Sequence, residues 1–261
     1  MEQSQLIVPS PRAQASDLNV LNDREQAMAV ERLPFTIRRV RNDADLQKAV
    51  HIRHAAYARH LPDFAQTLAL PEACDYERDV VVLLAESKLD GSAIGTARIQ
   101  TNLHQPLSVE ESVALPAWLQ GRRLVEVTRL GVDVGRVGRL VKLALFKAFF
   151  EYCEKNRIEW AVVTGRPPID QQYEKLLFKD IFPGMPHIPL SHVGNIPHRV
   201  MAFEIETAQA RWEQANHPLL DFFRHTRHPD IDIGASGPLA TPALRHRPSH
   251  ALTRFSAIAA A

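Results

Sequence analysis

Charged residues interrupt an apolar run near the middle of the chain, LVEVTRLGV, which has the composition of a β-strand. A buried charge in a sheet is costly unless it is paired, and a carboxylate in a cleft can take a proton as a general base. On a regular strand, Glu126 and Thr128 share one face and Arg129 lies on the other. We therefore predict that Glu126, Thr128 and Arg129 are catalytic; the alternative is a solvent-exposed face.

Glycines follow at positions 131 and 135, and they predict a bulge or a splayed strand end. A splayed strand leaves backbone N–H groups unpaired, and such groups could bind a ligand amide or an oxyanion. Arg98, on a neighbouring predicted strand, is expected to belong to an ion-pair network that holds Glu126 or Asp79. The sequence thus predicts a charged site at the end of a splayed strand.

The next residues place positive charge at the start of a predicted helix. A strongly amphipathic helical pattern begins at the residues Val134, Gly135, Arg136, Gly138 and Arg139. Cations oppose the macrodipole at a helix N-terminus, so they are favourable there only if an anion docks, and phosphate is the best candidate. Neither GxxxxGK[ST] nor GxGxxG after a first strand is present. The alternative is a solvated basic loop.

Hydrophobic periodicity predicts the elements that hold these residues in place. Their order describes one mixed α/β sheet with a helix-bearing crossover near its centre. Asp43 is expected to cap the first helix, and the first strand has the alternation of an edge strand. Strands are expected at 35–41, 79–86, 93–100, in the first half of 124–143, at 158–165, 187–192 and 199–205, and helices at 43–59, at 139–155 and after Pro168.

Composition shifts divide the chain into four segments. Residues 1–34 are expected to form a flexible arm, 35–206 the main domain and 207–231 a helical appendix that contains Trp212. Residues 232–261 are rich in Pro, Ala, Gly, Ser and His, which is typical of a disordered tail.

The overall composition excludes several classes of protein. The net charge of +1 lacks the excess of basic residues that is typical of nucleic-acid-binding proteins. No window has the roughly 20 apolar residues of a membrane span. Cys74 and Cys153 lie far apart without metal-type spacing, which together with the lack of a signal peptide favours the cytoplasm. The histidines of the C-terminal third match no zinc signature, so we predict no metal site.

Several short patterns together resemble a known family. Their order is similar to that of acyl-homoserine-lactone synthases, which have the Gcn5-related N-acyltransferase fold. The strand EVTRL, the closing strand IPHRVMAFEI and the Trp-containing appendix are more similar to the long-chain N-acyl amino acid synthases, over about residues 35–230. The four patterns are Arg53-x-x-x-Tyr57, the acidic pair Asp75 and Asp79, Gly95-x-x-Arg98 and Glu126-x-x-Arg129.

The resemblance implies an α/β (α+β) fold with a mixed, mostly antiparallel sheet, a splayed central strand pair and flanking helices. It implies transfer of a long-chain fatty acyl group from the phosphopantetheine thioester of acyl carrier protein to the α-amine of an amino acid. No tightly bound cofactor is expected. The site would comprise the three catalytic residues above and two further groups. The acceptor-binding or supporting residues would be Arg53, Tyr57, Asp75, Asp79 and Arg98. The residues that bind the pantetheine phosphate or the carrier protein would be Val134, Gly135, Arg136, Gly138 and Arg139.

Other activities of the same fold stay open at this point. The pyrophosphate signature Arg/Gln-x-x-Gly-x-Gly/Ala is absent: around Gly138 its outer positions are Gly135 and Leu140. This absence makes acyl-coenzyme A the less favoured donor. The alternatives are an acyl-homoserine-lactone synthase, a coenzyme A-dependent N-acetyltransferase and a non-catalytic acyl-binding module.

Overall fold

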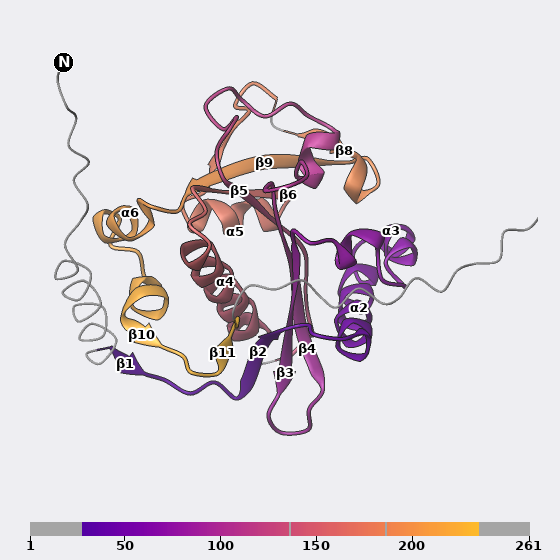
Figure 1. Cartoon of the computed structure of the whole chain (residues 1–261), viewed down its shortest axis with the longest axis vertical. Helices are drawn as coiled ribbons and strands as arrows, with labels where there is room; N and C mark the ends of the chain where they lie inside the picture. Colours follow the sequence, from indigo (N-terminus) through magenta and orange to yellow (C-terminus); the bar gives the residue numbers. More distant parts are fainter. Residues whose placement is uncertain (1–27, 136, 186, 235–261) are drawn as a thin grey trace, which may run out of the picture.

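A mixed sheet of nine strands forms the centre of the structure (Figure 1). The computed structural model describes residues 28–135, 137–185 and 187–234. The strands follow the order β11-β2-β3-β4-β5-β6-β9-β7, with β8 beside β9, and only the pairs β5–β6 and β11–β2 are parallel. The predicted mixed, mostly antiparallel sheet is therefore confirmed. Its strands are β2 (Phe35–Arg39), β3 (Val80–Ser87), β4 (Ala93–Thr101), β5 (Leu124–Val132), β6 (Trp160–Gly165), β7 (Lys179–Asp180), β8 (Ile188–Leu190), β9 (Ile196–Glu204) and β11 (Ile231–Asp232).

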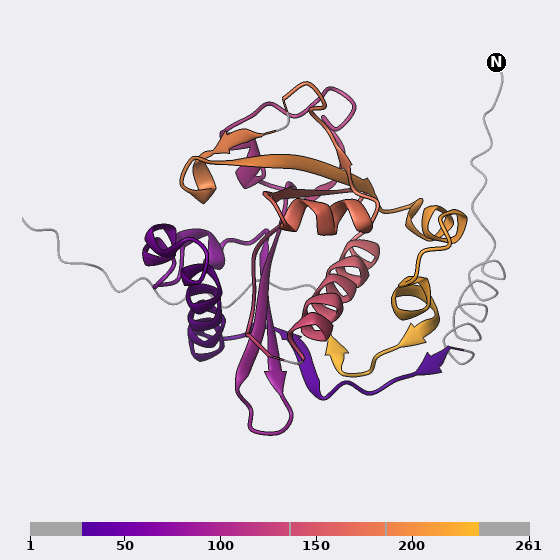
Figure 2. The same ribbon diagram turned by 180° about the vertical axis from the view of Figure 1, so that it is seen from behind.

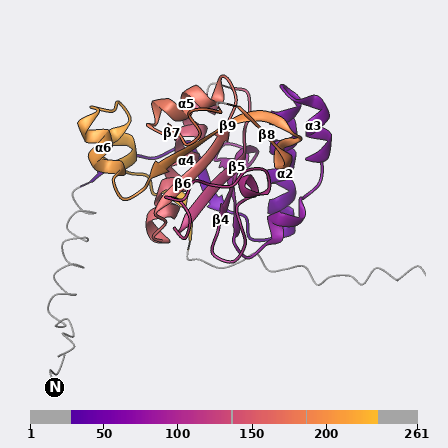
Figure 3. The same cartoon turned by 90° about the horizontal axis from the view of Figure 1, so that it is seen from above.

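Helices cover both faces of this sheet (Figures 1 and 2). On one face lie α4 (Gly138–Lys155), α5 (Ile169–Lys175) and α6 (Ala208–Gln214), and on the other lie α2 (Asp43–Ala58) and α3 (Pro62–Thr67). The view from above shows the two groups on opposite sides of the strands (Figure 3). Short helical turns complete the fold: η1 (Ala73–Tyr76), η2 (Ser108–Glu111), η3 (Ser191–Val193) and the π-helical η4 (Asp221–His225).

The main core lies between the sheet and α4. Val141, Leu145 and Phe149 of this helix are buried against the strands, and full burial of one such side chain stabilises the fold by about 1.5–3 kcal/mol. A Cβ atom at Gly95 of β4 would lie 2.5 Å from a methyl group of Val141, so the glycine permits this close approach. The helix that follows β5 is thereby fixed against the strands that carry the predicted site.

The N-terminus of α2 is capped one residue earlier than predicted. The side chain of Asn42 accepts a hydrogen bond from the backbone N–H of Asp45 at 2.9 Å, so Asn42 is the N-cap. Asp43 instead occupies the first turn, where its charge is favourable to the helix dipole. The expected cap at Asp43 was wrong because both residue types satisfy the same pattern.

Segments near both ends of the described chain pack against the domain. Residues Ala29–Val30 (β1) pair with Thr226–Arg227 (β10), and the N–H of Leu33 donates to the carboxylate of Asp230 at 2.9 Å. Trp212 of α6 is fully buried in the main core. The last residues of the expected arm, from position 28 onward, are thus held in place, while residues 1–27 and 235–261 lie outside the described part.

Candidate active site

The two central strands separate where the predicted catalytic residues lie. Pairing between the parallel strands β5 and β6 ends at Val127 and Val163, although both strands continue. On the other side of β5, the register with β4 shifts between Thr96 and Arg98, which inserts one extra residue into β5 near Arg129. Arg129 has a φ of 53°, a left-handed conformation that is uncommon outside glycine and that clusters at functional sites. The predicted splay and bulge are both present.

The bulge also changes the face of the sheet on which Arg129 lies. Arg129 donates to the carboxylate of Glu72 at 2.7 and 2.6 Å. Arg98, which lies opposite Thr128 on β4, donates to the same carboxylate at 2.9 Å. Arg129 therefore lies on the same side as Thr128 and Glu126, contrary to the expectation from regular alternation, because the extra residue shifts the phase of the strand.

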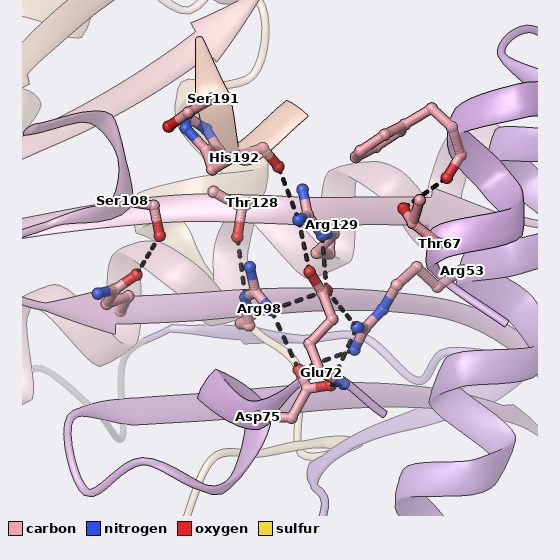
Figure 4. Close-up of polar contacts among 12 residues, drawn as sticks. Arg53, Thr67, Glu72, Asp75, Arg98, Ser108, Thr128, Arg129, Ser191 and His192 are labelled. Atoms are coloured by element: carbon pink, nitrogen blue, oxygen red, sulfur yellow. Dashed lines mark hydrogen bonds and ion pairs between the residues drawn. The ribbon is translucent and has the colours of Figure 1, made fainter. Parts of the chain in front are cut away.

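Three arginines share two carboxylates on this face (Figure 4). Glu72 also accepts from Arg53 at 2.8 Å, and Asp75 accepts from both ends of the Arg53 guanidinium at 3.0 Å. Burial raises the pKa of Glu72, but the hydrogen bond from Arg129 and the nearby charges of Arg98 and Arg53 outweigh it and bring the pKa to about 2. With both carboxylates ionised, this arginine–carboxylate network has one positive charge in excess.

Glu126 lies beside this network but is not part of it. Its side chain is fully buried, and one carboxyl oxygen, Oε2, accepts a hydrogen bond from the backbone N–H of Val109 in η2 at 3.0 Å. No arginine of the described part lies within ion-pair distance of Glu126. Burial raises the pKa of this carboxyl to about 7, and the bond from Val109 and the charges of Arg98 and Arg129 only partly oppose the rise. A carboxyl of this pKa is suited to proton transfer near neutral pH.

The remaining oxygen of Glu126 faces a histidine. Nε2 of His192, in η3, lies 3.5 Å from Oε1 of Glu126, and the carbonyl of His192 accepts from Arg129 at 2.9 Å. Burial, followed by the charge of Arg129, lowers the pKa of His192 to about 4, so the ring is neutral at pH 7. Glu126 is therefore enclosed between a backbone N–H and an uncharged imidazole.

Replacing Glu126 by glutamine is expected to stabilise the fold at alkaline pH. The folded-state pKa of about 7 lies above the ordinary 4.5, so the buried carboxyl disfavours folding once the unfolded chain ionises. The penalty is absent below pH 4.5, grows as the pH rises and reaches about 3 kcal/mol above pH 7. Thermal unfolding should show a more stable Glu126→Gln variant at pH 8 and no gain at pH 4; an equal gain at both values would contradict this assignment.

A cavity of about 370 Å³ occupies the opening between β5 and β6. Its size is typical of a small-molecule site. Its walls are formed by β5 from Val127 onward, by the end of β6 and by the start of α5. Aromatic rings are added by Tyr57, Phe64 and Tyr173. Thr128 and Arg129 line it, whereas Glu126, two residues before Thr128 on the strand, does not.

The predicted phosphate region lies where α4 begins. Val134 is exposed, and a Cβ atom at Gly138 would lie 2.7 Å from the carbonyl oxygen of Asp133, which explains the need for glycine at the first residue of the helix. No side chain caps α4, and its first turn contains no acidic residue. Arg139 is exposed in this turn, Gly135 precedes it, and Arg136 lies outside the described residues. The N–H of Gly138 donates to the carbonyl of Gly135 at 3.2 Å, so the next N–H groups of the first turn, which lack a partner within the helix, are the ones that could meet an anion.

The structure brings together most of the predicted supporting residues. Arg53, Asp75 and Arg98 meet in the network, and Tyr57 lines the cavity one helical turn from Arg53. Asp79 does not join them: its carboxylate binds the backbone N–H and the ring of His104. The predicted contact of Arg98 with Glu126 or Asp79 was also wrong, because its guanidinium binds the carboxylates of Glu72 and Asp75 instead.

Two residues of this site were not predicted. Glu72 lies in a polar loop with no periodic pattern, and His192 is one of the histidines of the C-terminal third, for which the sequence predicts no site. The three predicted arginines already had three predicted acidic partners, so the sequence offers no clear signal for Glu72. In the described ranges no group of three metal-binding side chains is present, and no helix there has the length and apolar character to cross a membrane.

A splayed pair of parallel strands, with a helix after the first of them, defines the Gcn5-related N-acyltransferase fold, so the predicted fold class is confirmed. Among solved structures, the chain is similar to FeeM, an N-acyl amino acid synthase from uncultured soil microbes. The TM-score is 0.54 at 20% identity, and the match covers 69% of this chain and 96% of FeeM. The family suggested by sequence patterns thus also appears among the structural neighbours.

Weaker similarities extend to other acyltransferases. The coenzyme A-dependent acyl-homoserine lactone synthase BjaI matches with a TM-score of 0.49 at 17% identity, over 77% of this chain and 95% of BjaI. The ribosomal-protein-S18-alanine N-acetyltransferase from Escherichia coli matches with a TM-score of 0.45 at 18% identity, over 66% of this chain and 94% of that enzyme. No protein-family profile and no curated protein matches the sequence.

Proposed function

We propose that this protein is an N-acyltransferase that moves a long-chain fatty acyl group from the phosphopantetheine thioester of acyl carrier protein to the α-amine of an amino acid. One observation carries the proposal above all: a fully buried carboxyl, Glu126, lies beside a cavity at the splayed strands and has a pKa of about 7. A buried carboxyl of that kind is expensive for the fold and is typical of a catalytic base.

The reaction follows from the positions of these groups. The neutral amine attacks the thioester carbonyl carbon, the N–C bond forms, and the ammonium proton passes to the Glu126 carboxylate. The C–S bond then breaks, and the pantetheine thiolate takes up the proton that Glu126 returns. The products are an amide and a thiol, without a covalent enzyme intermediate.

Thr128 is the link between the cavity and Glu126 in this scheme. It lines the cavity and lies two residues after Glu126 on the same face. Its hydroxyl oxygen accepts from Nε of Arg98 at 3.1 Å, so its own proton is available for a second hydrogen bond. We assign Thr128, with water, to the relay that carries the amine proton inward.

The backbone after Val127 would stabilise the oxyanion. Residues from Thr128 onward have no partner in β6, so the N–H groups on that side of β5 face the opening. Donors that are fixed before the reaction stabilise a developing negative charge without reorganisation. The excess positive charge of the arginine–carboxylate network favours the same anionic intermediate.

A direct assay tests the proposed function. The purified chain is incubated with long-chain acyl carrier protein and a mixture of amino acids, and the lipid extract is analysed by mass spectrometry beside Glu126→Ala and Arg129→Ala. N-acyl amino acids should form only with the unchanged chain. The proposal fails if none form while acetyl-coenzyme A supports acetylation of a small amine.

Charge reversal at the start of α4 should weaken the interaction with the donor. Arg139 is exposed there, and the resemblance implies an acidic carrier protein. We expect Arg139→Glu to raise the KM for acyl carrier protein about tenfold, which corresponds to ~1.4 kcal/mol, with little change in kcat. Lys155→Glu, at the exposed far end of the same helix, is the matched control. Equal KM values for Arg139→Glu and the unchanged chain would exclude this docking surface.

A further inference from the structure

The turn between β8 and β9 brings an unusual pair of buried polar groups together. His192 of η3 has a side chain that is only 5% exposed, and its Nε2 atom lies 3.5 Å from Oε1 of Glu126. Within the described residues, neither ring nitrogen has a hydrogen-bond partner, and neither does Oε1. Buried polar atoms without partners are rare in native structures, and each one requires an explanation.

The backbone around His192 is held firmly. Ser191 donates its N–H to the hydroxyl of Ser112 at 2.8 Å, and its own hydroxyl donates to Glu111 at 3.1 Å. These bonds tie η3 to η2, which is the element that supplies the Val109 N–H to Glu126. Two short helices from distant parts of the chain thus enclose one carboxyl group and are fixed to each other.

The opposite side of the turn is fixed as well. The carbonyl of His192 accepts from Arg129, and Gly194 adopts a left-handed conformation with φ of 72°. A Cβ atom at Gly194 would lie 3.2 Å from the ring of Phe64 in α3, so the turn packs closely against that helix. The backbone that carries the imidazole is therefore fixed close to Glu126.

We propose that His192 is a positioning residue for Glu126, and that its neutral ring donates Nε2–H to Oε1 when the carboxyl is ionised. The role of Glu126 as a base rests on the proposed function, whereas the interaction itself does not. A separation of 3.5 Å is slightly long for a hydrogen bond. Hydrogen bonds to an ionised acceptor are shorter than those to a neutral one, so this contact is expected to shorten when Glu126 loses its proton.

Other charged groups around Glu126 do not replace this contact. The guanidinium groups of Arg98 and Arg129 are engaged by Glu72 and act on Glu126 only at longer range. The imidazole is thus the only side-chain group of the described part that lies within ion-pair distance of Glu126. The titratable groups that face the pair are Arg98, Glu110, Arg129, Tyr173 and His198, together with Glu72.

Direct titration of Glu126 tests the contact without any assay of activity. The Glu126 carboxyl is followed by infrared or carbon-13 spectroscopy, with Glu126→Gln as the difference reference. His192→Phe removes the donor and should raise the pKa of Glu126 by about one unit, since a hydrogen bond to a charged group is worth that much. His192→Gln keeps an N–H at similar reach and should restore most of the original value.

The pH dependence of acyl transfer gives the second measurement. The acidic limb of kcat/KM should move about one pH unit higher in His192→Phe and return toward its original position in His192→Gln. His217→Gln, which alters a buried histidine bonded to the carbonyl of Lys175, is the control and should leave the limb unchanged.

The two measurements separate the inference from the proposed function. An unchanged Glu126 pKa in His192→Phe overturns the positioning role, whether or not acyl transfer is observed. A shifted Glu126 pKa supports it even if no acyl donor is accepted, and in that case only the proposed function fails. A lower kcat in His192→Phe with an unmoved acidic limb would also overturn the inference, since a purely structural role predicts that result.

Discussion

Glu126→Gln is expected to lower kcat for acyl transfer by a factor of about 10²–10⁴, the usual contribution of a general base. The amide has nearly the shape of the carboxyl and can still accept from the Val109 N–H, but it cannot take the proton of the amine. Because the pKa of Glu126 is about 7, activity of the unchanged enzyme should fall as the pH drops below neutrality. The residual activity of the variant should lack this acidic limb.

A matched substitution isolates the effect of the buried carboxyl. Glu159→Gln removes a carboxylate at the surface, where Glu159 accepts from the backbone of Arg123, and should leave kcat unchanged. Steady-state kinetics between pH 5.5 and 9, with circular dichroism to verify folding, provide the comparison. A folded Glu126→Gln variant with full activity would remove Glu126 from the mechanism.

Glu72→Gln is expected to be the most destabilising substitution at the site. The carboxylate receives hydrogen bonds from Arg53, Arg98 and Arg129, and its loss leaves three buried guanidinium groups with Asp75 as their remaining acid. Removing one partner from a buried ionic cluster costs about 3–5 kcal/mol. For a domain of this size, that loss corresponds to a fall in the melting temperature of roughly 10 °C.

The pH dependence of this loss has a definite sign. The folded-state pKa of Glu72 is about 2, below its ordinary 4.5, so its stabilising effect is complete above pH 4.5 and disappears as the pH falls toward 2. Chemical unfolding should therefore show a large difference in the free energy of unfolding between the unchanged protein and Glu72→Gln at pH 7, and a smaller difference at pH 3. Glu77→Gln, five residues further in the same loop, has no such network and is the control. A difference that is constant with pH would contradict the role of the ionised Glu72 carboxylate as the shared acceptor of the three arginines.

Much of this fold can be read from local patterns in the sequence. Apolar runs and turn residues locate β3, β4 and β6, and the amphipathic pattern locates α4 to within one residue. These elements bury continuous apolar faces, so their periodicity is strong. The resemblance adds a mostly antiparallel sheet with a splayed central strand pair, which single elements do not determine. The N-cap at Asn42 shows the usual limit, since two adjacent residues have the same capping chemistry.

The site is only partly predictable, for reasons of geometry. Regular alternation places Arg129 on the wrong face because the pattern contains no information on the inserted residue of a bulge. Glu72 and His192 come from loops, where position depends on long-range packing rather than on neighbouring residues. Asp79 has the right charge and a plausible spacing, but its carboxylate binds His104. Spacing alone could not distinguish it from Glu72.

The enclosure of Glu126 by η2 and η3 also bears on the order in which the protein matures. The bonds that close this enclosure join Ser112 to Ser191 and Arg129 to His192, across sequence separations of 79 and 63 residues. A nascent chain that ends before β8 already contains β2 to β6, yet the Glu126 carboxyl would remain hydrated. Contacts of such long separation form late because they require the closure of long loops. Synthesis of the protein should therefore yield the part of the sheet from β2 to β6 before a working proton acceptor.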